Sequence, residues 1–122
     1  MEITLHDSIN QITGTTILKY TNNSPDTLDR IYLHLYPNAF QVGSVKYREY
    51  VGNAGRVSRA KYFKDQLDGF TSKIDIHDFS IALPKQGQSW IHKTPILRNY
   101  KIDDTILEAH LLKHIAPGET AR

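Results

Sequence analysis

Residues 20–40 read Tyr-Thr-Asn-Asn-Ser-Pro-Asp-Thr-Leu-Asp-Arg-Ile-Tyr-Leu-His-Leu-Tyr-Pro-Asn-Ala-Phe, and this stretch decides the fold. An extended run ends at Thr21. Residues 22–26 then supply turn chemistry, because Pro25 fixes φ while Asn and Asp accept left-handed geometry. After the turn, apolar and polar positions alternate strictly: Ile31, Leu33 and Leu35 against Tyr32, His34 and Tyr36. A period of two is typical of a strand with one buried face, so the stretch predicts strand, turn and strand.

The residues before this stretch continue the β pattern. Ile3 and Leu5 alternate with polar neighbours and predict a short first strand. Residues 12–21 predict a longer strand, in which Gly14 indicates a bulge or a close backbone approach. We expect this longer strand to pair with residues 31–36 as an antiparallel hairpin, with a loop over residues 22–29.

Residues 41–72 form a long excursion in which the period of two disappears. Several glycines punctuate it, and only residues 58–67 have a helical pattern. Ser58 is a suitable cap there, and Phe63 and Leu67 lie one turn apart. The excursion therefore predicts one short helix between strands.

Strand character returns at Lys73. The apolar positions change parity between Ile76 and Phe79, which predicts a bulge or bend near His77. A turn is expected over residues 84–87, and Pro95 makes residues 90–97 an edge strand at most. Residues 105–111 alternate again and precede a turn at residues 116–119.

The end of the chain carries an expectation of its own. After Pro117-Gly118 a new segment starts and stops within four residues, Glu119 to Arg122. A hairpin without its second strand leaves ladder groups unpaired, so we expect this segment to lack a partner. This pattern predicts a fragment of a longer chain.

Composition limits the classes of protein to which this chain can belong. The chain has 122 residues, 39% hydrophobic and 23% charged, which suits one globular domain. A net charge of +2 gives no argument for a polyanionic partner, and the lack of cysteine excludes disulfides and thiolate metal sites. No apolar run is long enough to cross a bilayer, and the first residues do not resemble a signal peptide.

Two histidine patterns are the candidates for metal binding. His110 and His114 have the outer spacing of a His-Glu-x-x-His helix, but position 111 is Leu and the alternation predicts a strand. In a strand these imidazoles would be about 13 Å apart, beyond joint ligation. Asp75 and His77 would share a strand face, although no third ligand is evident. We therefore expect no metal site and no cofactor in this chain.

A basic segment with interleaved aromatic residues runs from Lys46 to Lys64, and residues 52–55 have the Gly-x-x-Gly pattern of an RNA-binding loop. A solvated loop or a surface that docks onto another domain explains the segment better, because β signals surround it. Nucleophilic catalysis has no motif here, with no cysteine and no Gly-x-Ser-x-Gly elbow. Asn22 to Ser24 fits a glycosylation acceptor, a pattern that turns often produce by chance.

Several segments together resemble the start of bacterial zinc aminopeptidase-like proteins, the gluzincins related to aminopeptidase N. The resemblance is carried by residues 12–14, 17–26, 28, 31–35 and 37–40, and at the other end by residues 104–111 and 116–119. Residues 41–72 and about 85–100 match nothing in the family. The motifs are more specific than a lone glycine signature and less specific than a catalytic motif.

The resemblance implies a β-rich, saddle-shaped N-terminal domain that packs against a thermolysin-like catalytic domain. In the family, the zinc ligands of His-Glu-x-x-His, a distal Glu and the Gly-x-Met-Glu-Asn segment lie in that later domain, and this chain contains none of them. Zinc and the peptide substrate would therefore belong to the missing domain. Some family members have lost activity, and the parent is expected to be an exported bacterial metallopeptidase or an inactive relative.

Together these features predict an all-β fold over residues 1–122. We expect a mostly antiparallel saddle-like sheet or a two-layer β-sandwich, with one short helix in the excursion. The expected function is that of a non-catalytic, excised N-terminal accessory domain that covers a catalytic domain of the same polypeptide and shapes its cleft. No catalytic residue, nucleic-acid partner or membrane insertion is expected.

The alternative is a free-standing β-sandwich that binds carbohydrate or serves in adhesion. In that case Trp90 and tyrosines such as Tyr32 and Tyr36 would form a stacking platform. A more distant possibility is binding of single-stranded nucleic acid through residues 46–64, which predicts a steep dependence of affinity on salt.

Overall fold

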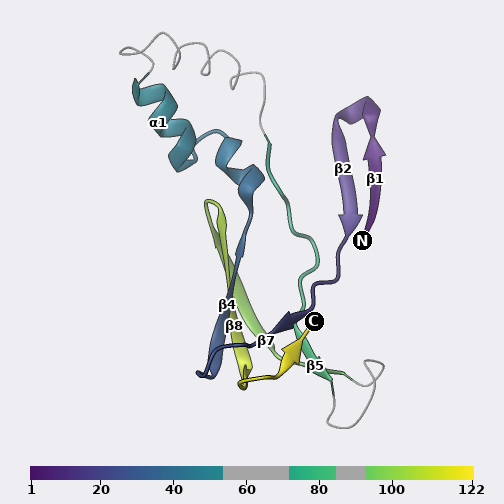
Figure 1. Cartoon of the computed structure of the whole chain (residues 1–122). Coiled ribbons are helices and arrows are strands. Elements are labelled where there is room, and N and C mark those ends of the chain that lie inside the picture. The colour runs from purple at the N-terminus through teal and green to yellow at the C-terminus, as the bar shows by residue number, and fades with distance from the viewer. Residues whose placement is uncertain (54–71, 85–92) are drawn as a thin grey trace. The chain divides into compact units, whose positions relative to one another are not determined.

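The computed structural model describes residues 1–53, 72–84 and 93–122 (Figure 1). The described elements are predominantly strands in small sheets, with one α-helix and two short 3₁₀ helices. In chain order they are β1 (Glu2–His6), η1 (Asp7–Ile9), β2 (Gln11–Thr15), β3 (Tyr20–Thr21), β4 (Leu28–His34), η2 (Tyr36–Phe40), α1 (Val45–Asn53), β5 (Ala82–Pro84), β6 (Lys93–Pro95), β7 (Leu97–Asp103), β8 (Ile106–Ile115) and β9 (Thr120–Ala121). The all-β, mostly antiparallel fold class is therefore confirmed. The choice between a saddle and a two-layer sandwich stays a prediction.

The chain divides into two compact units. The first contains residues 1–28, 80–96 and 113–122, and the second contains residues 29–79 and 97–112. Each unit therefore collects segments that are distant in the sequence. The expectation of a single domain over residues 1–122 stays a prediction, and the units are described separately below.

The first unit begins with the β1–β2 hairpin. Its strands are antiparallel, and Leu5 lies opposite Ile12 while Ile3 lies opposite Gly14. A Cβ atom on Gly14 would lie 2.6 Å from the backbone oxygen of Glu2, so only glycine fits there without a shift. The expected first strand and the close approach at Gly14 are confirmed. The expected pairing of residues 12–21 with residues 31–36 is wrong.

The reason for that error lies in the turn at Asn22, which directs the strands on either side of it to different partners. β3 pairs with β9, so that Tyr20 lies opposite Ala121, whereas β4 pairs with β8. The side chain of Asn22 is fully buried. Its amide nitrogen donates to the backbone oxygens of Asp26 and Ile115, at 2.8 and 3.0 Å. Backbone bonds join Asn22 to the turn that precedes β9: Asn22 N–H donates to Glu119 O, and Gly118 N–H donates to Asn22 O.

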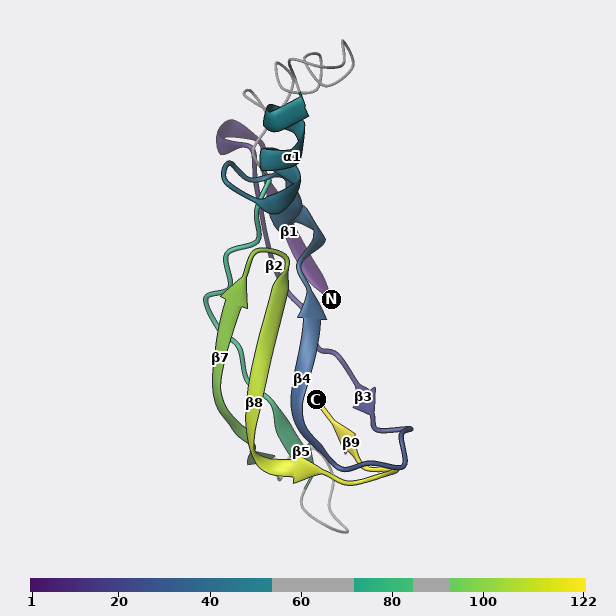
Figure 2. The ribbon, with the colours of Figure 1, turned by 90° about the vertical axis from the view of Figure 1, so that its left-hand side faces the viewer.

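Strand β9 also corrects the expectation that the last segment lacks a partner. Besides pairing with β3, it is followed by Arg122, which exchanges backbone hydrogen bonds with Ala82 of β5 at 2.8 and 3.0 Å. The expected turn at residues 116–119 is confirmed, with Glu119 N–H donating to Ala116 O. The ladder groups of this segment are thus paired within the first unit, as Figure 2 shows for β3 and β9.

Strands β5 and β6 complete the first unit as an antiparallel pair. Among the described residues β6 pairs with β5 alone, as expected for an edge strand that contains Pro95. The core of this unit includes Leu83, Ile96 and Ile115, which are almost entirely buried. The expected turn at residues 84–87 and Trp90 fall largely or wholly outside the described residues.

The second unit is built on the three-stranded sheet in the order β4-β8-β7 (Figure 2). The period of two is confirmed in β4, where Ile31 and Leu33 are less exposed than Tyr32 and His34, and continues to the buried Leu35. It is confirmed in β8 as well, because Leu107, Ala109 and Leu111 are all buried. The sheet therefore has one apolar face and one polar face.

The described helix of the excursion is α1. Ser44 caps its start: the Ser44 hydroxyl accepts a hydrogen bond from Tyr47 N–H at 3.0 Å. Asp104, in the turn between β7 and β8, adds a carboxylate that accepts from Val45 N–H at 3.1 Å. The helix expected at residues 58–67 lies outside the described residues. Helix α1 was not predicted from the sequence, because its first turn lacks the acidic residue that often accompanies a serine cap.

Residues 73–81 contradict the expectation of a strand. The structure has a bend at His77, as the change of parity indicated, but the first strand of this region is β5, at Ala82. The backbone N–H of Ile74 does not pair with another strand and donates to the side-chain oxygen of Asn38, at 2.7 Å. Asn38 in turn donates to the backbone oxygen of Asp104, so one buried asparagine joins η2 to two other segments.

Candidate functional site

The polar face of the β4-β8-β7 sheet has a charged cluster centred on Glu108. Lys101 of β7 lies directly opposite Glu108 in the ladder, and its ammonium nitrogen is 2.8 Å from Glu108 Oε2. Strand β4 contributes Arg30, whose guanidinium donates to Glu108 Oε1 at 3.1 Å. It also contributes Tyr32, whose hydroxyl donates to the same oxygen at 3.2 Å. His110 Nε2 lies 3.4 Å from Oε1. We call these five residues the Glu108 cluster.

Sheet geometry explains why these side chains meet. Residues two apart in a strand share a face, which places Arg30 with Tyr32 and Glu108 with His110. The order β4-β8-β7 then puts Glu108 on the central strand, between donors from both edges. Glu108 lies on the polar face of the sheet, yet it is only 9% exposed, because the side chains from both neighbouring strands cover it.

The electrostatics of the cluster keep the carboxylate ionised. The hydrogen bond from Lys101 is the main cause that lowers the pKa of Glu108 below its ordinary value of 4.5, and it outweighs the opposite effect of burial. The same bond raises the pKa of Lys101 above its ordinary value of 10.5. For Arg30 the pKa is raised as well, chiefly by a hydrogen bond to Asp29.

Together with Asp29, which binds Arg30, the cluster is therefore a charge-balanced polar surface. Glu108 accepts hydrogen bonds at both carboxylate oxygens, and Arg30 divides its donors between Asp29 and Glu108. These bonds hold the side chains of Arg30 and Lys101 in place and leave their other N–H groups available to solvent or a ligand. Near neutral pH, Glu108 acts only as a hydrogen-bond acceptor.

A second surface lies on the β1–β2 hairpin. Ile3, Leu5 and Ile12 share one face through their ladder pairings, and their exposed fractions are 58%, 67% and 68%. The opposite face is polar and includes His6, whose ring nitrogen lies 2.9 Å from the hydroxyl of Thr13. The hairpin is thus amphipathic with an open apolar face, which we call the hairpin apolar face. Two-stranded hairpins are marginally stable alone in water and gain stability by packing.

The residues considered for metal binding lie in strand β8 and in the segment before β5. His110 and His114 are both in strand β8, as the alternation predicted, and His110 belongs to the Glu108 cluster. Asp75 pairs with Lys73 at 2.9 Å, in a segment that is not a strand. Within residues 1–53, 72–84 and 93–122 there is no group of three or more His, Cys, Asp and Glu side chains that could hold a metal.

The basic segment from residue 46 to residue 64 is described only at its start, in α1. Lys46 places its ammonium 4.3 Å from the centre of the Phe40 ring, a cation–π contact. The remainder of the segment, including residues 54 and 55 of the Gly-x-x-Gly pattern, lies outside the described residues. Of the helices that the structure describes, none is sufficiently long and apolar to cross a membrane.

Asn22, the candidate glycosylation acceptor, is used for a structural purpose. Its side chain is buried and holds the turn at residues 22–26, where the hydroxyl and the backbone N–H of Ser24 both donate to the Asn22 side-chain oxygen. An asparagine in this position has no free amide to present on the folded chain.

Sequence reasoning missed the Glu108 cluster. The feature that could have revealed it is the turn at Asp104-Thr105. This turn joins β7 to β8 and sets the register that puts Lys101 opposite Glu108. Strand β7 was difficult to recognise because a register shift between Leu97 and Asn99 interrupts its alternation.

No protein-family model, curated protein or solved structure matches the chain. The resemblance to aminopeptidase N-related proteins therefore stays a prediction, and so does every functional expectation that depends on it.

Proposed function

We propose that this chain is a non-catalytic accessory domain that packs, through the hairpin apolar face, on the zinc aminopeptidase-like catalytic domain of a longer polypeptide. The hairpin apolar face carries the proposal. Three large aliphatic side chains of one short hairpin are each more than half exposed. Contiguous exposed apolar patches on a soluble protein commonly mark surfaces that contact a partner.

The chemistry of the hairpin suits a covering role. Its apolar face is free of charge, whereas the other face has Glu2 and His6, which remain compatible with water when the apolar face is covered. Packing would also supply the stability that a two-stranded hairpin lacks alone. The identity of the partner rests on the sequence resemblance, which assigns zinc and the substrate's amine to the catalytic domain. This chain would shape the approach to that cleft.

The first experiment measures binding of a hydrophobic dye and sedimentation velocity on the isolated chain. We expect a dye response and concentration-dependent self-association, because the partner is missing. The variant Leu5→Thr/Ile12→Thr changes two directly paired positions on the apolar face and should lower both signals. The variant Thr4→Ser/Thr13→Ser changes the neighbouring pair on the polar face and should leave them unchanged.

The second experiment tests the identity of the partner. The reading frame downstream of this chain in its native gene should encode a His-Glu-x-x-His segment, and the domain that contains it should bind the isolated chain in a pull-down. Binding should weaken in Leu5→Thr/Ile12→Thr and persist in Thr4→Ser/Thr13→Ser. A monodisperse monomer without a dye response, together with a frame that lacks the motif, would contradict the proposal.

A further inference from the structure

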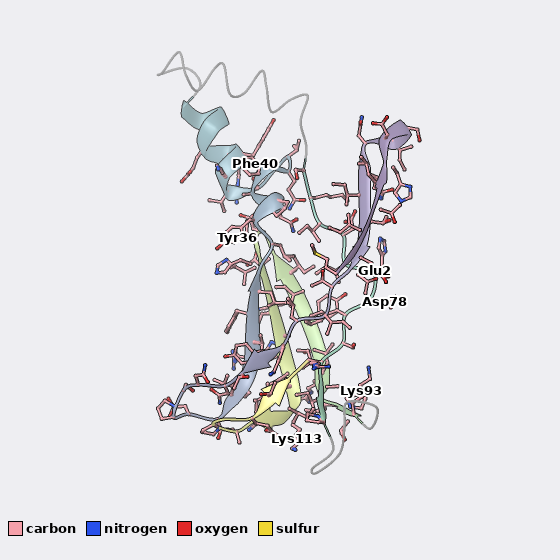
Figure 3. The ribbon with its side chains drawn as sticks, turned by 45° about the vertical axis from the view of Figure 1, so that its right-hand side comes forward. Glu2, Tyr36, Phe40, Asp78, Lys93 and Lys113 are labelled. Atoms are coloured by element: carbon pink, nitrogen blue, oxygen red, sulfur yellow. The ribbon has the colours of Figure 1, made fainter. Side chains whose placement is uncertain are left out.

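Three rings follow one another at every second position along one side of the second unit. Tyr32 and His34 lie in β4, and Tyr36 follows at the start of η2. All three are exposed, with fractions of 52% for Tyr32 and 70% for Tyr36. Figure 3 labels Tyr36 where β4 leads into η2. We call these residues the aromatic row.

The rings of the aromatic row are held in place before any ligand arrives. The Tyr32 hydroxyl donates to Glu108, which fixes one end of the ring while more than half of the residue stays exposed. The His34 and Tyr36 rings stack with centres 5.3 Å apart and planes 10° from parallel. Exposed aromatic groups that are already ordered lose little conformational entropy when a ligand packs on them.

The Glu108 cluster shares Tyr32 with the aromatic row and determines which ligand suits it. Its cations are already paired: Arg30 with Asp29 and Glu108, and Lys101 with Glu108. A polyanion such as a nucleic acid would compete with these carboxylates and gain little from cations that are already neutralised. A neutral ligand with many hydroxyl groups would meet no such repulsion, because side chains of the cluster offer both donors and acceptors.

We propose that the aromatic row and the Glu108 cluster together form a binding site for a neutral oligosaccharide. One face of a pyranose ring presents C–H groups, which pack on the apolar face of an aromatic ring. The hydroxyls at the edge of the sugar then exchange hydrogen bonds with polar groups such as those of Lys101 and His110. One sugar would pack on the Tyr32 ring, and a neighbouring sugar on the face of the Tyr36 ring that is turned away from His34. This function is separate from packing on a catalytic domain, since it uses no residue of the hairpin apolar face.

The test uses the full chain and a panel of neutral hexasaccharides: cellohexaose, xylohexaose, maltohexaose and hexa-N-acetylchitohexaose. Calorimetric titration should detect binding of at least one of them, with a Kd that hardly changes between low and high salt. Oligo(dT) and a heparin hexasaccharide serve as charged comparators and should bind more weakly. If none of the neutral hexasaccharides binds detectably, the proposal is overturned. Preferential, steeply salt-dependent binding of the charged comparators would overturn it as well.

Variants locate the site. Tyr32→Ala and Tyr36→Ala should each raise the Kd about fivefold or more, as expected for the loss of one stacked ring. Tyr32→Phe keeps the ring but loses its bond to Glu108, and should fall between the wild type and Tyr32→Ala. Tyr36→Ala keeps the test valid if Tyr32→Ala does not fold, because Tyr36 is not a member of the Glu108 cluster.

Two control variants complete the test. Tyr20→Ala removes a ring that is 41% exposed in β3, outside the aromatic row, and should bind as the wild type does. Leu5→Thr/Ile12→Thr should also keep its affinity for the sugar, which separates this site from the hairpin apolar face. Unchanged affinity in both Tyr32→Ala and Tyr36→Ala would overturn the proposed site.

Discussion

Lys101 and Glu108 occupy directly opposite positions of β7 and β8, and the Lys101 ammonium nitrogen lies 2.8 Å from Glu108 Oε2. Two further donors from β4, Arg30 and Tyr32, approach the other carboxylate oxygen. A single carboxylate of the central strand thus links all three strands of the sheet. Removal of its charge should therefore affect the whole second unit.

The first prediction concerns acid stability. The pKa of Glu108 is lowered in the folded chain from its ordinary value of 4.5, so the unfolded state takes up this proton more readily. The stabilisation is complete above that ordinary value and is lost as the pH falls through the lowered folded-state pKa. Glu108→Gln should be less stable than the wild type near neutral pH and should lose less stability on acidification. Urea unfolding at several values between neutral and strongly acidic pH measures both effects.

The control for this experiment is Glu2→Gln, which removes a carboxylate from an exposed position of β1. It should retain the acid dependence of the wild type. Parallel pH profiles for Glu108→Gln and the wild type would show that the cluster does not determine acid stability.

The second prediction concerns Asn22. Replacement by alanine leaves the backbone oxygens of Asp26 and Ile115 without the amide that now donates to them. We expect Asn22→Ala to lower the free energy of unfolding by about 2–3 kcal/mol, as for other buried groups that lose their partners. Asn23→Ala changes the exposed neighbour and should cost no more than about 0.5 kcal/mol. Equal losses in the two variants would contradict the role given to Asn22.

The third prediction concerns Gly14. Because a Cβ would meet the backbone oxygen of Glu2 at 2.6 Å, Gly14→Ala should separate β1 from β2 locally. Amide hydrogen exchange should become faster in both strands. Gly52→Ala, in α1, is the matched control: nothing lies within 4 Å of its added Cβ, and alanine should stabilise the helix by up to about 1 kcal/mol. Unchanged exchange in Gly14→Ala would mean that the strands can separate slightly without losing their pairing.

The fourth prediction concerns the start of α1. Ser44→Ala removes the hydroxyl that accepts from Tyr47 N–H and should lower the free energy of unfolding by about 1 kcal/mol. Helical circular dichroism should decrease at the same time. Val45→Ala alters the next, exposed side chain without removing the cap, and its helical signal should be maintained. A decrease confined to Val45→Ala would exclude Ser44 as the cap.

The sequence predicted those parts of the fold that depend on neighbouring residues. Alternation identified the buried faces at Leu35 and Leu107, and the Pro117-Gly118 turn was recognised from its composition. Pairing partners were harder to predict, because β3 takes its partner from the other end of the chain. The residues between Tyr20 and Leu28 would suit a hairpin loop equally well. What separates the two sheets is the Asn22 side chain, and its acceptor at Ile115 is too distant in the sequence to be recognised.

The candidate site was predictable only in part. The alternation separated Tyr32 and Tyr36 from the apolar positions but did not decide what they pack against, and in the structure both are exposed. Glu108 could not be assigned as the centre of a cluster, because its donors come from positions 30, 32 and 101 and meet only after the three strands have paired. Burial of a charged residue depends on such neighbours, and local pattern does not show them.

The pairing of β3 with β9 has a consequence for the order in which the chain acquires structure during synthesis. Thr21 and Thr120, whose hydroxyls lie 2.9 Å apart, are separated by 99 positions. A ribosome delivers Tyr20 and Thr21 early, yet they have no ladder until Thr120 and Ala121 have also emerged. The β7–β8 hairpin closes over a few residues and is free to form sooner. Strand β3 must therefore wait for residues about a hundred positions later, whereas the β1–β2 and β7–β8 hairpins need only nearby residues.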